Sequence, residues 1–358
     1  SYYHPHCRLS DLVHKRSKEG SEEDGEERNH RKQYCCNVQI HSEKREQNGY
    51  SELLEPDHAA VECNAEDSDH KEARIAQYLP DIRDPELVFL SSFHLVGLPG
   101  LTVDRFSDII VTQVLSYGMD KIKDLIYTSI VKILRDDGQE ISGLYERNDV
   151  AIRKLEGLEE YKGWYEPIPH PDSTVTEITE NGIKYFVDVE NGQKTGFFLD
   201  QKYNRLTVAQ LAKGKKVLDC FTHTGSFALN AAMGGAERVT AVDISKTAVE
   251  MARENAIRNG LDGRMDFLAA DVFDLLPELE SKGGKPYDFI ILDPPAFTKS
   301  RKTVKGAERG YKEINYRAMK LLPRGGYLAT CSCSHFMNNE LFVKMLHSAA
   351  ADAADATI

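Results

Sequence analysis

The sequence has no apolar run near the roughly 20 residues that a membrane-spanning helix needs. The first residues, Ser1 to His6, lack the charged and then apolar pattern of a signal peptide. We therefore expect a cytoplasmic protein that has no membrane partner. The seven cysteines include no Cys-x-x-Cys pair, which argues against a disulfide framework and against a zinc ribbon.

A basic surplus is also missing, because the formal net charge is -12. This excludes a nucleic-acid binder whose whole surface is positive, but it says nothing about local patches. Two groups of histidine and cysteine have looser spacing than closed zinc sites, so we predict free thiols and no metal. These groups are His4, His6 and Cys7, and Cys35, Cys36 and Cys63.

Composition divides the chain into three zones. Residues 1–79 are polar and aperiodic, and we expect a low-complexity, charged segment that is disordered because it has no apolar face to bury. Residues 80–190 predict a small α+β domain with an Asn181-Gly182 hairpin turn. Its expected strands are 101–106, 108–115, 143–145, 175–178 and 183–189, and its expected helix is 120–134.

Strands and helices alternate in the third zone, residues 191–358. Such alternation predicts an α/β fold with a doubly wound, Rossmann-like parallel sheet. Ser245 is the expected N-cap of one helix. The expected strands are 215–221, 238–244, 265–271, 287–293 and 326–332, and the expected helices are 225–233, 245–259 and 315–322.

Ligands of such a sheet bind beyond the carboxyl ends of its strands. The first strand ends in Asp219-Cys-Phe-Thr-His-Thr-Gly225, and the second ends in Asp243, which can accept both hydroxyls of a ribose. A dinucleotide needs Gly-x-Gly-x-x-Gly, and this loop has a single glycine. S-adenosylmethionine (SAM) carries no phosphate, and its positive charges suit Asp219, while Asp271 would reach the adenine amino group. The alternative is that these aspartates are strand-end caps facing water.

The fourth strand closes with Asp293-Pro-Pro-Ala-Phe297, whose prolines fix the backbone just past the strand. Such a segment is typical of methyltransferases that act on a planar nitrogenous group. It does not distinguish a ring carbon from an exocyclic nitrogen. We expect the Asp293 carboxylate to face the substrate.

Two cysteines in Thr330-Cys-Ser-Cys-Ser334 make that distinction. Cytosine C5 is too weak a nucleophile to take a methyl group directly, but a thiolate that adds to C6 activates it. We predict Cys333 as the nucleophile. Cys331, two residues earlier on the same strand face, is the reserve candidate. The alternative is that both are small buried hydrophobes.

A basic segment lies between these two motifs. Residues 296–324 contain nine Lys or Arg and two Glu, a local charge of +7 that suggests phosphate contacts. Two aromatic side chains beside them, Phe297 and Tyr311, could stack on a base. A solvated basic helix face is the alternative. The expected RNA contacts are Phe297, Lys299, Arg301, Arg309, Tyr311 and Lys312.

The chain resembles the large-subunit (23S) ribosomal RNA cytosine-C5 methyltransferase family from about Val96 to Ala354. The motifs that carry the resemblance are Gly97–Arg105, Tyr145–Asp149, Arg153–Gly157, Lys194–Gln201, Asp219–Gly225, Asp293–Arg301, Arg309–Asn315 and Cys331–Ser334. The resemblance implies methyl transfer from SAM to cytidine C5 of ribosomal RNA, with Cys333 as nucleophile. It also places Lys194–Gln201 at the mouth of the cofactor pocket. The expected cofactor residues are Asp219, Phe221, Thr224, Gly225, Asp243, Asp271, Asp293 and Gln201.

The sequence departs from this family at both ends. Family members begin with a small β-rich RNA-binding domain of the PUA type, which residues 1–79 do not resemble. They also continue past the cysteine strand with two further strands. We therefore expect that strand to have an unpaired edge.

Two alternatives stay open: a guanine-modifying ribosomal RNA methyltransferase, and a truncated remnant that binds SAM or RNA without catalysis. The sequence does not indicate an oligomeric state.

Overall fold

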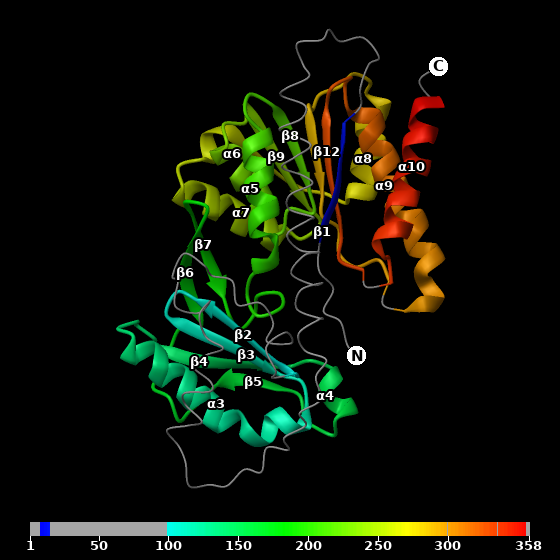
Figure 1. Ribbon diagram of the computed structural model, residues 1–358. Coiled ribbons are helices and arrows are strands. Elements are labelled where there is room, and N and C mark those ends of the chain that lie inside the picture. The colour runs from blue at the N-terminus through cyan, green and yellow to red at the C-terminus, as the bar shows by residue number, and fades with distance from the viewer. Residues whose placement is uncertain (1–7, 15–98, 299, 335, 356–358) are drawn as a thin grey trace, which may run out of the picture. The chain divides into compact units, whose positions relative to one another are not determined.

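The computed structural model describes residues 8–14, 99–298, 300–334 and 336–355 (Figure 1). Of residues 1–79, for which we predicted disorder, the structure describes only residues 8–14, and these form a strand. The rest of that prediction lies outside the described residues. The histidines and cysteines that we weighed as metal ligands there also lie outside them. The two predicted boundaries between the three zones stay predictions.

A four-stranded sheet and one long helix form the predicted α+β part. Strands β2 and β3 pair antiparallel, β3 and β4 pair parallel, and β4 and β5 pair antiparallel. The helix α3 (Tyr117–Asp136) buries Ile126, Ile130 and Leu134, which share one face because they are spaced by four residues. Prediction missed β5 and α4 (Ile152–Leu155). The strands are β2 (Leu101–Phe106), β3 (Ile109–Val114), β4 (Gly143–Asn148) and β5 (Tyr161–Trp164).

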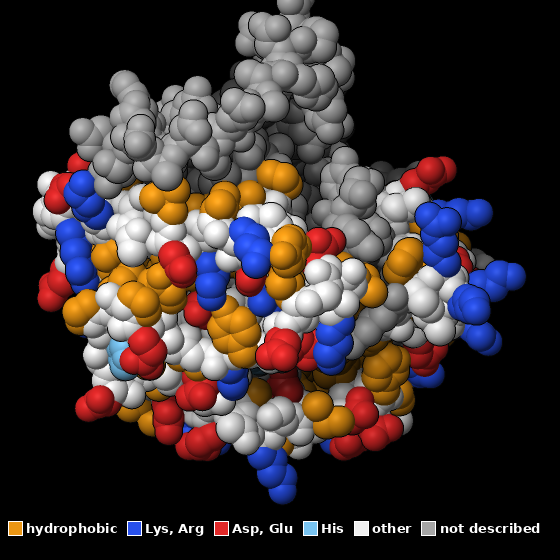
Figure 2. All heavy atoms as spheres, turned by 90° about the horizontal axis from the view of Figure 1, so that it is seen from below, with side chains coloured by type: hydrophobic (Ala, Val, Ile, Leu, Met, Phe, Trp, Pro, Cys, Tyr) orange, Lys and Arg blue, Asp and Glu red, His pale blue; other side chains and the backbone are white. Residues whose placement is uncertain are grey.

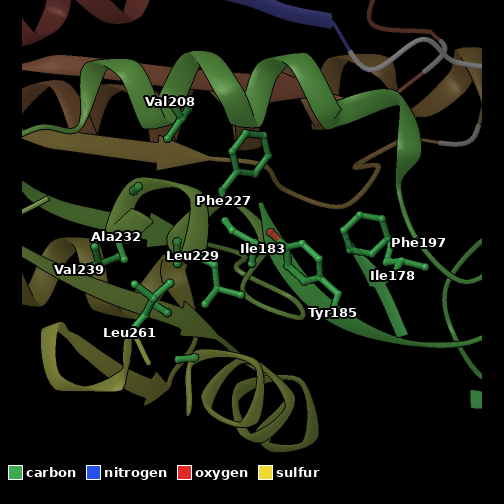
Figure 3. Close-up of a cluster of buried hydrophobic side chains, with 14 of the residues drawn as sticks. Ile178, Ile183, Tyr185, Phe197, Val208, Phe227, Leu229, Ala232, Val239 and Leu261 are labelled. Carbon is green, nitrogen blue, oxygen red and sulfur yellow. The ribbon is translucent and has the colours of Figure 1, made fainter. Parts of the chain in front are cut away.

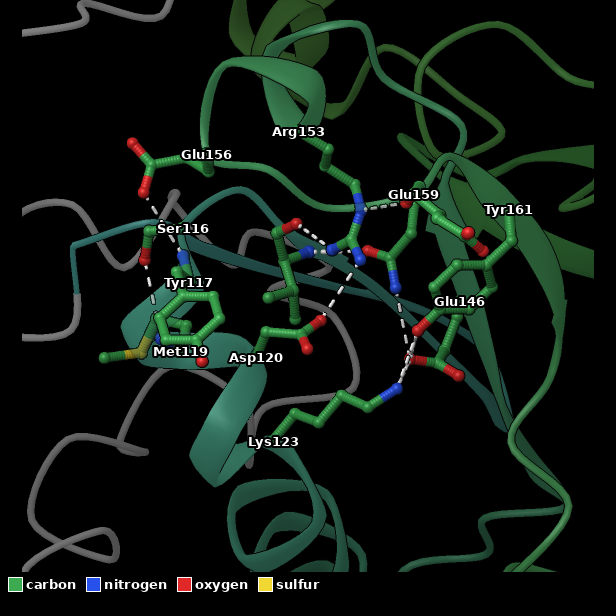
Figure 4. Close-up of polar contacts among 12 residues, drawn as sticks. Ser116, Tyr117, Met119, Asp120, Lys123, Glu146, Arg153, Glu156, Glu159 and Tyr161 are labelled. Atoms are coloured by element: carbon green, nitrogen blue, oxygen red, sulfur yellow. Dashed lines mark hydrogen bonds and ion pairs between the residues drawn. The ribbon is translucent and has the colours of Figure 1, made fainter.

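Arg153, which is only 2% exposed, ties this part together (Figure 4). Its guanidinium donates to the backbone carbonyls of Val114 at 2.6 Å and Glu159 at 2.7 Å, and to the Asp120 carboxylate at 3.1 Å. A buried guanidinium needs such partners, since an unpaired one would carry a large desolvation cost. The same figure shows the Lys123 ammonium paired with Glu146 at 2.9 Å.

The predicted Rossmann-like sheet is present, with six strands in the order β1-β12-β11-β8-β9-β10. The five strands from β12 to β10 run parallel, and β1 pairs antiparallel with β12. The chain fills one side of β8 with β9 and β10 before it crosses to β11 and β12, which makes a topological switch point between β8 and β11. The strands are β1 (Arg8–His14), β8 (Lys216–Cys220), β9 (Arg238–Asp243), β10 (Met265–Ala269), β11 (Phe289–Leu292) and β12 (Tyr327–Ser332).

Helices cover both faces of this sheet (Figure 1). Alternate strand residues point to opposite faces of the sheet. Val217 therefore packs with the helices on one face (α5, α6 and α7), and Leu218 packs with those on the other (α8, α9 and α10). Figure 3 shows part of the hydrophobic core that contains Val217, in which Val208 and Phe227 cluster with Tyr185. The helices are α5 (Lys202–Leu211), α6 (Ser226–Met233) and α7 (Lys246–Arg258) on one face, and α8 (Val272–Ser281), α9 (Val304–Leu321) and α10 (Asn339–Asp355) on the other.

The predicted hairpin forms strands β6 (Val175–Glu180) and β7 (Ile183–Asp188), joined at Asn181 and Gly182. Sequence placed it in the small domain, where Thr176 donates to Asp108 at 3.2 Å, but it also bonds to residues of the helices that cover the larger sheet. Asn181 donates to Asn230 of α6 at 3.0 Å, and Asn259 beside α7 bonds both the N–H and the carbonyl of Lys184.

Two expectations were wrong. The outer edge of β12 is not unpaired, because β1 bonds to it from Arg8 to His14 and thereby satisfies backbone groups that would otherwise face solvent. Helix α9 begins at Val304, well before the expected residue 315. Its buried Ala307, Tyr311 and Ile314 have helical spacing that the surrounding lysines, arginines and glycines obscured.

Candidate active site

Asp219 lies at the end of β8, at the switch point, and is 1% exposed. Its Oδ2 accepts hydrogen bonds from the Thr222 hydroxyl at 2.6 Å and from the backbone N–H of Ala228 at 3.0 Å. Its Oδ1 is buried and has no partner among the described residues. Burial, with Asp293 and Asp243 nearby, raises the pKa of Asp219 to about 7. Such an oxygen suits a ligand that brings a donor or a positive charge.

The loop after Asp219 is tightly folded. Phe221 and His223 adopt left-handed backbone angles, with φ of 64° and 51°, which is uncommon for residues other than glycine. Gly225 has a φ of 83°, and a Cβ there would lie 2.9 Å from the Cβ of Ala252. Glycine is therefore required at this position. The buried Thr224 hydroxyl in the same loop has no partner among the described residues.

Asp243 and Asp271 both accept hydrogen bonds from backbone N–H groups. Asp243 accepts from the N–H of His223 at 3.0 Å and from that of Ser245 at 2.9 Å, and Asp271 accepts from the N–H of Phe273 at 2.8 Å. Ser245 is the N-cap of α7, as predicted. Each carboxylate oxygen has a second lone pair. Ligand binding by either aspartate therefore stays a prediction.

The segment Lys194–Gln201 contributes a buried glutamine and an ion pair. Gln201 is 1% exposed and bonds to Asn204 at 2.6 Å. Lys194 pairs with Asp200 at 3.0 Å. Burial first, and then Asp200, raises the pKa of Asp293 to about 6, while Arg205 and Lys194 act against this shift. Asp293 can therefore exchange a proton near neutral pH.

The two candidate cysteines differ in exposure. Cys333, just past β12, is half-buried, and its thiol donates to the carbonyl of Pro294 at 3.5 Å. Cys331 is fully buried, and burial raises the pKa of its thiol well above the usual value. A buried neutral thiol is a poor nucleophile. Cys333 is therefore the more accessible of the two thiols, and it bonds to the Asp293-Pro-Pro loop through Pro294.

The structure corrects the expectation that Tyr311 stacks on a base. Its ring is fully buried and packs against Phe297 at 4.6 Å between centroids and against Phe342 at 5.6 Å. Its hydroxyl bonds to Ser334 at 2.9 Å and to Ser332 at 3.1 Å. No face of this ring is open to a base. Phe297 is half-buried and keeps the predicted role as a prediction.

Part of the basic segment is neutralised by acidic partners. Lys312 pairs with Asp352 of α10 at 2.7 Å, so the expected RNA contact at Lys312 competes with an ion pair. Arg317 and Lys320 both pair with Glu280. Lys299 lies outside the described residues.

Two exposed arginines remain near the start of α9, at Arg301 and Arg309. Lysine and arginine side chains gather at the right-hand edge of Figure 2, on the side where α9 lies in Figure 1. Elsewhere on that face basic and acidic side chains are mixed.

Sequence reasoning missed three hydroxyl groups that organise the site: Thr222, Ser332 and Ser334. All three lie inside the motifs Asp219–Gly225 and Cys331–Ser334, so their place in these motifs could have indicated a role in the site. Within the described residues, no three His, Cys, Asp or Glu side chains gather as a metal site would require. Nor is any helix of that part long and apolar enough to span a membrane.

Comparison with known proteins identifies the family. Residues 164–354 match the family model described as S-adenosylmethionine-dependent methyltransferase. The ribosomal RNA large subunit methyltransferase I of Aeromonas salmonicida is 45% identical over 78% of this chain and 71% of that protein. Its namesake in Aeromonas hydrophila is 48% identical over 72% of this chain and 63% of that protein.

A solved structure agrees with the fold. SMU.776, crystallised in complex with SAH, superposes with a TM-score of 0.65 at 25% identity, covering 78% of this chain and 72% of that one. Of the two Aeromonas relatives, the chain spans 71% of the first and 63% of the second. It belongs to the S-adenosylmethionine-dependent methyltransferase family and, within it, to the group of ribosomal RNA large subunit methyltransferase I.

Proposed function

We propose that this protein transfers a methyl group from SAM to C5 of a cytidine in large-subunit ribosomal RNA. The relatives carry large-subunit ribosomal RNA in their names. The observation that supports the cytosine chemistry is the place of the Cys333 thiol. It is half-exposed, lies at the carboxyl end of β12 and bonds to Pro294 in the loop that follows the neighbouring strand β11.

The residues at the end of β8 fit SAM. The free Oδ1 of Asp219 can accept from its ammonium group or face its sulfonium, and the free hydroxyl of Thr224 offers a second contact. Gly225 keeps the loop close to the ligand. Asp243 and Asp271 would hold the ribose and the adenine through their remaining lone pairs, with Phe221, Gln201 and Asp293 lining the same pocket.

The chain's own residues then perform the steps at the base. The Cys333 thiolate adds to C6 of the cytosine and forms a C–S bond, which gives C5 the character of an enamine carbon. SAM supplies an electrophilic methyl group, which C5 takes up. A base must remove the C5 proton, and the C–S bond then breaks to return the thiolate. Asp293, with a pKa of about 6, is suited to accept that proton.

Exposed basic side chains would hold the RNA backbone. Arg301 and Arg309 lie at the start of α9, which follows the Asp293-Pro-Pro loop in the chain. Phe297, in the same loop, is the remaining aromatic candidate for stacking. Lys299 belongs to this group by its place in the sequence.

The test is to incubate the protein with methyl-labelled SAM and unmodified large-subunit ribosomal RNA and to identify the labelled nucleoside. We expect 5-methylcytidine. Label in a guanosine would replace this proposal by the guanine-modifying alternative. SAM binding without any label would favour the non-catalytic remnant.

Two variants assign the nucleophile. Cys333→Ala should lower incorporation at least 1,000-fold, because the C6 adduct cannot form without the thiol, while SAM binding persists. Cys331→Ala removes the reserve thiol. Loss of activity in Cys331→Ala and retention in Cys333→Ala would assign the nucleophile to Cys331 instead.

A further inference from the structure

The Tyr311 hydroxyl sits between the two loops that carry the proposed chemistry. Its ring is fully buried, and Ser334 beside it is 3% exposed. The Ser332 hydroxyl donates to the Tyr311 oxygen at 3.1 Å, and the Tyr311 ring packs against that of Phe297 at 4.6 Å between centroids. Ser332 and Ser334 flank Cys333, and Phe297 belongs to the Asp293-Pro-Pro loop.

A phenol has two acceptor lone pairs and one donor proton, so the Tyr311 hydroxyl can bond to both serines at once. The Ser332 hydroxyl donates to the Tyr311 oxygen, and the Tyr311–Ser334 bond at 2.9 Å can run in either direction. Burial raises the pKa of Tyr311, so the hydroxyl keeps its proton at neutral pH. The two bonds hold both serine side chains against the one Tyr311 oxygen.

The network constrains Cys333 from both neighbours. The N–H of Ser334 donates to the Ser332 hydroxyl at 3.3 Å, which closes a small turn around the cysteine. The two serine side chains are held by Tyr311, while the thiol between them bonds to Pro294. Tyr311 thus joins the end of β12 to the loop after β11.

We propose that Tyr311 is a positioning residue that holds Cys333 at the attacking distance from the base, by fastening Ser332 and Ser334 to the Asp293-Pro-Pro loop. This inference rests on the proposed cytosine chemistry. Tyr311 does not touch the substrate, because its ring is closed in by Phe297 and Phe342.

The decisive variant is Tyr311→Phe, which keeps the ring and removes only the hydroxyl. We expect kcat to fall by about 10- to 100-fold, since small misplacement of a reacting group costs rates of this order. The KM for SAM should stay within about twofold, because no proposed cofactor residue bonds to the Tyr311 hydroxyl. Tyr316→Phe is the matched control, as Tyr316 lies on the same helix and packs with Arg317 and Lys320.

The second readout is covalent trapping on ribosomal RNA that contains 5-fluorocytidine, in the presence of SAM. Fluorine at C5 leaves no proton to remove, so the Cys333–C6 adduct persists and its rate of formation is measured on denaturing gels. Rates are normalised to the SAM-binding sites counted by titration, which removes any loss of folded protein. Ser334→Ala, a milder change, should slow trapping in the same direction.

The outcomes separate the two proposals. Trapping of the wild type, none in Cys333→Ala, and a rate in Tyr311→Phe at least tenfold slower would support the positioning role. Trapping of Tyr311→Phe and Ser334→Ala at the wild-type rate per SAM site would overturn that role and leave the cytosine chemistry intact. No adduct with the wild type would refute both.

Discussion

Replacing Asp219 should change how SAM binding depends on pH. Burial raises the pKa of this carboxyl to about 7 in the ligand-free protein, and SAM, being cationic, binds the ionised form. The ionised fraction rises from about one tenth at pH 6.0 to about three quarters at pH 7.5, so the affinity should rise roughly eightfold. The range stops at pH 7.5 because α-amino groups lose their proton just above it.

The sign of the matching stability effect follows from the same shift. The folded pKa lies above the ordinary value of 3.8, so the folded state holds this proton more tightly than the unfolded chain. The resulting stabilisation is complete below pH 3.8 and is lost as the pH rises through about 7. Bound SAM favours the ionised form, so it should raise the melting temperature more at pH 7.5 than at pH 6.0.

Isothermal titration calorimetry at both pH values measures the effect. The Asp219→Asn variant keeps an oxygen for Thr222 and for the N–H of Ala228, so the loop should stay folded while the titration disappears. We expect weaker SAM binding in this variant, without the eightfold rise. Equal wild-type affinities at the two pH values would refute the reasoning, as would an unchanged rise in the variant.

Two further perturbations test the fold and the RNA contacts. Glu180 and Arg205, both buried, form a two-pronged pair at 2.6 and 2.8 Å. Glu180→Ala should therefore lower the free energy of unfolding by about 3–5 kcal/mol in urea titrations, because an unpaired buried guanidinium remains; a loss below 1 kcal/mol would contradict this. Changing both Arg301 and Arg309 to Ala should weaken ribosomal RNA binding. It should also reduce the slope of log K against the logarithm of the salt concentration by about 1–2, measured by filter binding from about 50 to 200 mM salt. Arg264→Ala, at the opposite edge of the sheet, is the control; equal salt slopes for all three proteins would exclude the phosphate contacts.

The sequence was sufficient for the five parallel strands of the larger sheet and for where they end, but not for β1. The strand–helix alternation predicted a parallel sheet, and the loop with Asp219 and Gly225 was found at the switch point. The Asn181-Gly182 turn and the Ser245 cap are present as predicted. These features depend on residues close in the chain, whose periodicity and turn chemistry are local properties.

The tertiary structure decided which side chains are available to act. Tyr311 and Lys312 are neighbours in one basic motif, yet one is buried beneath the cysteine loop and the other pairs with α10. Cys331 and Cys333 were predicted on one strand face, but Cys331 is fully buried and Cys333 is half-buried. The partner of the β12 edge comes from more than 300 residues away in the chain. Burial and pairing of this kind depend on contacts between distant segments, which local sequence patterns do not contain.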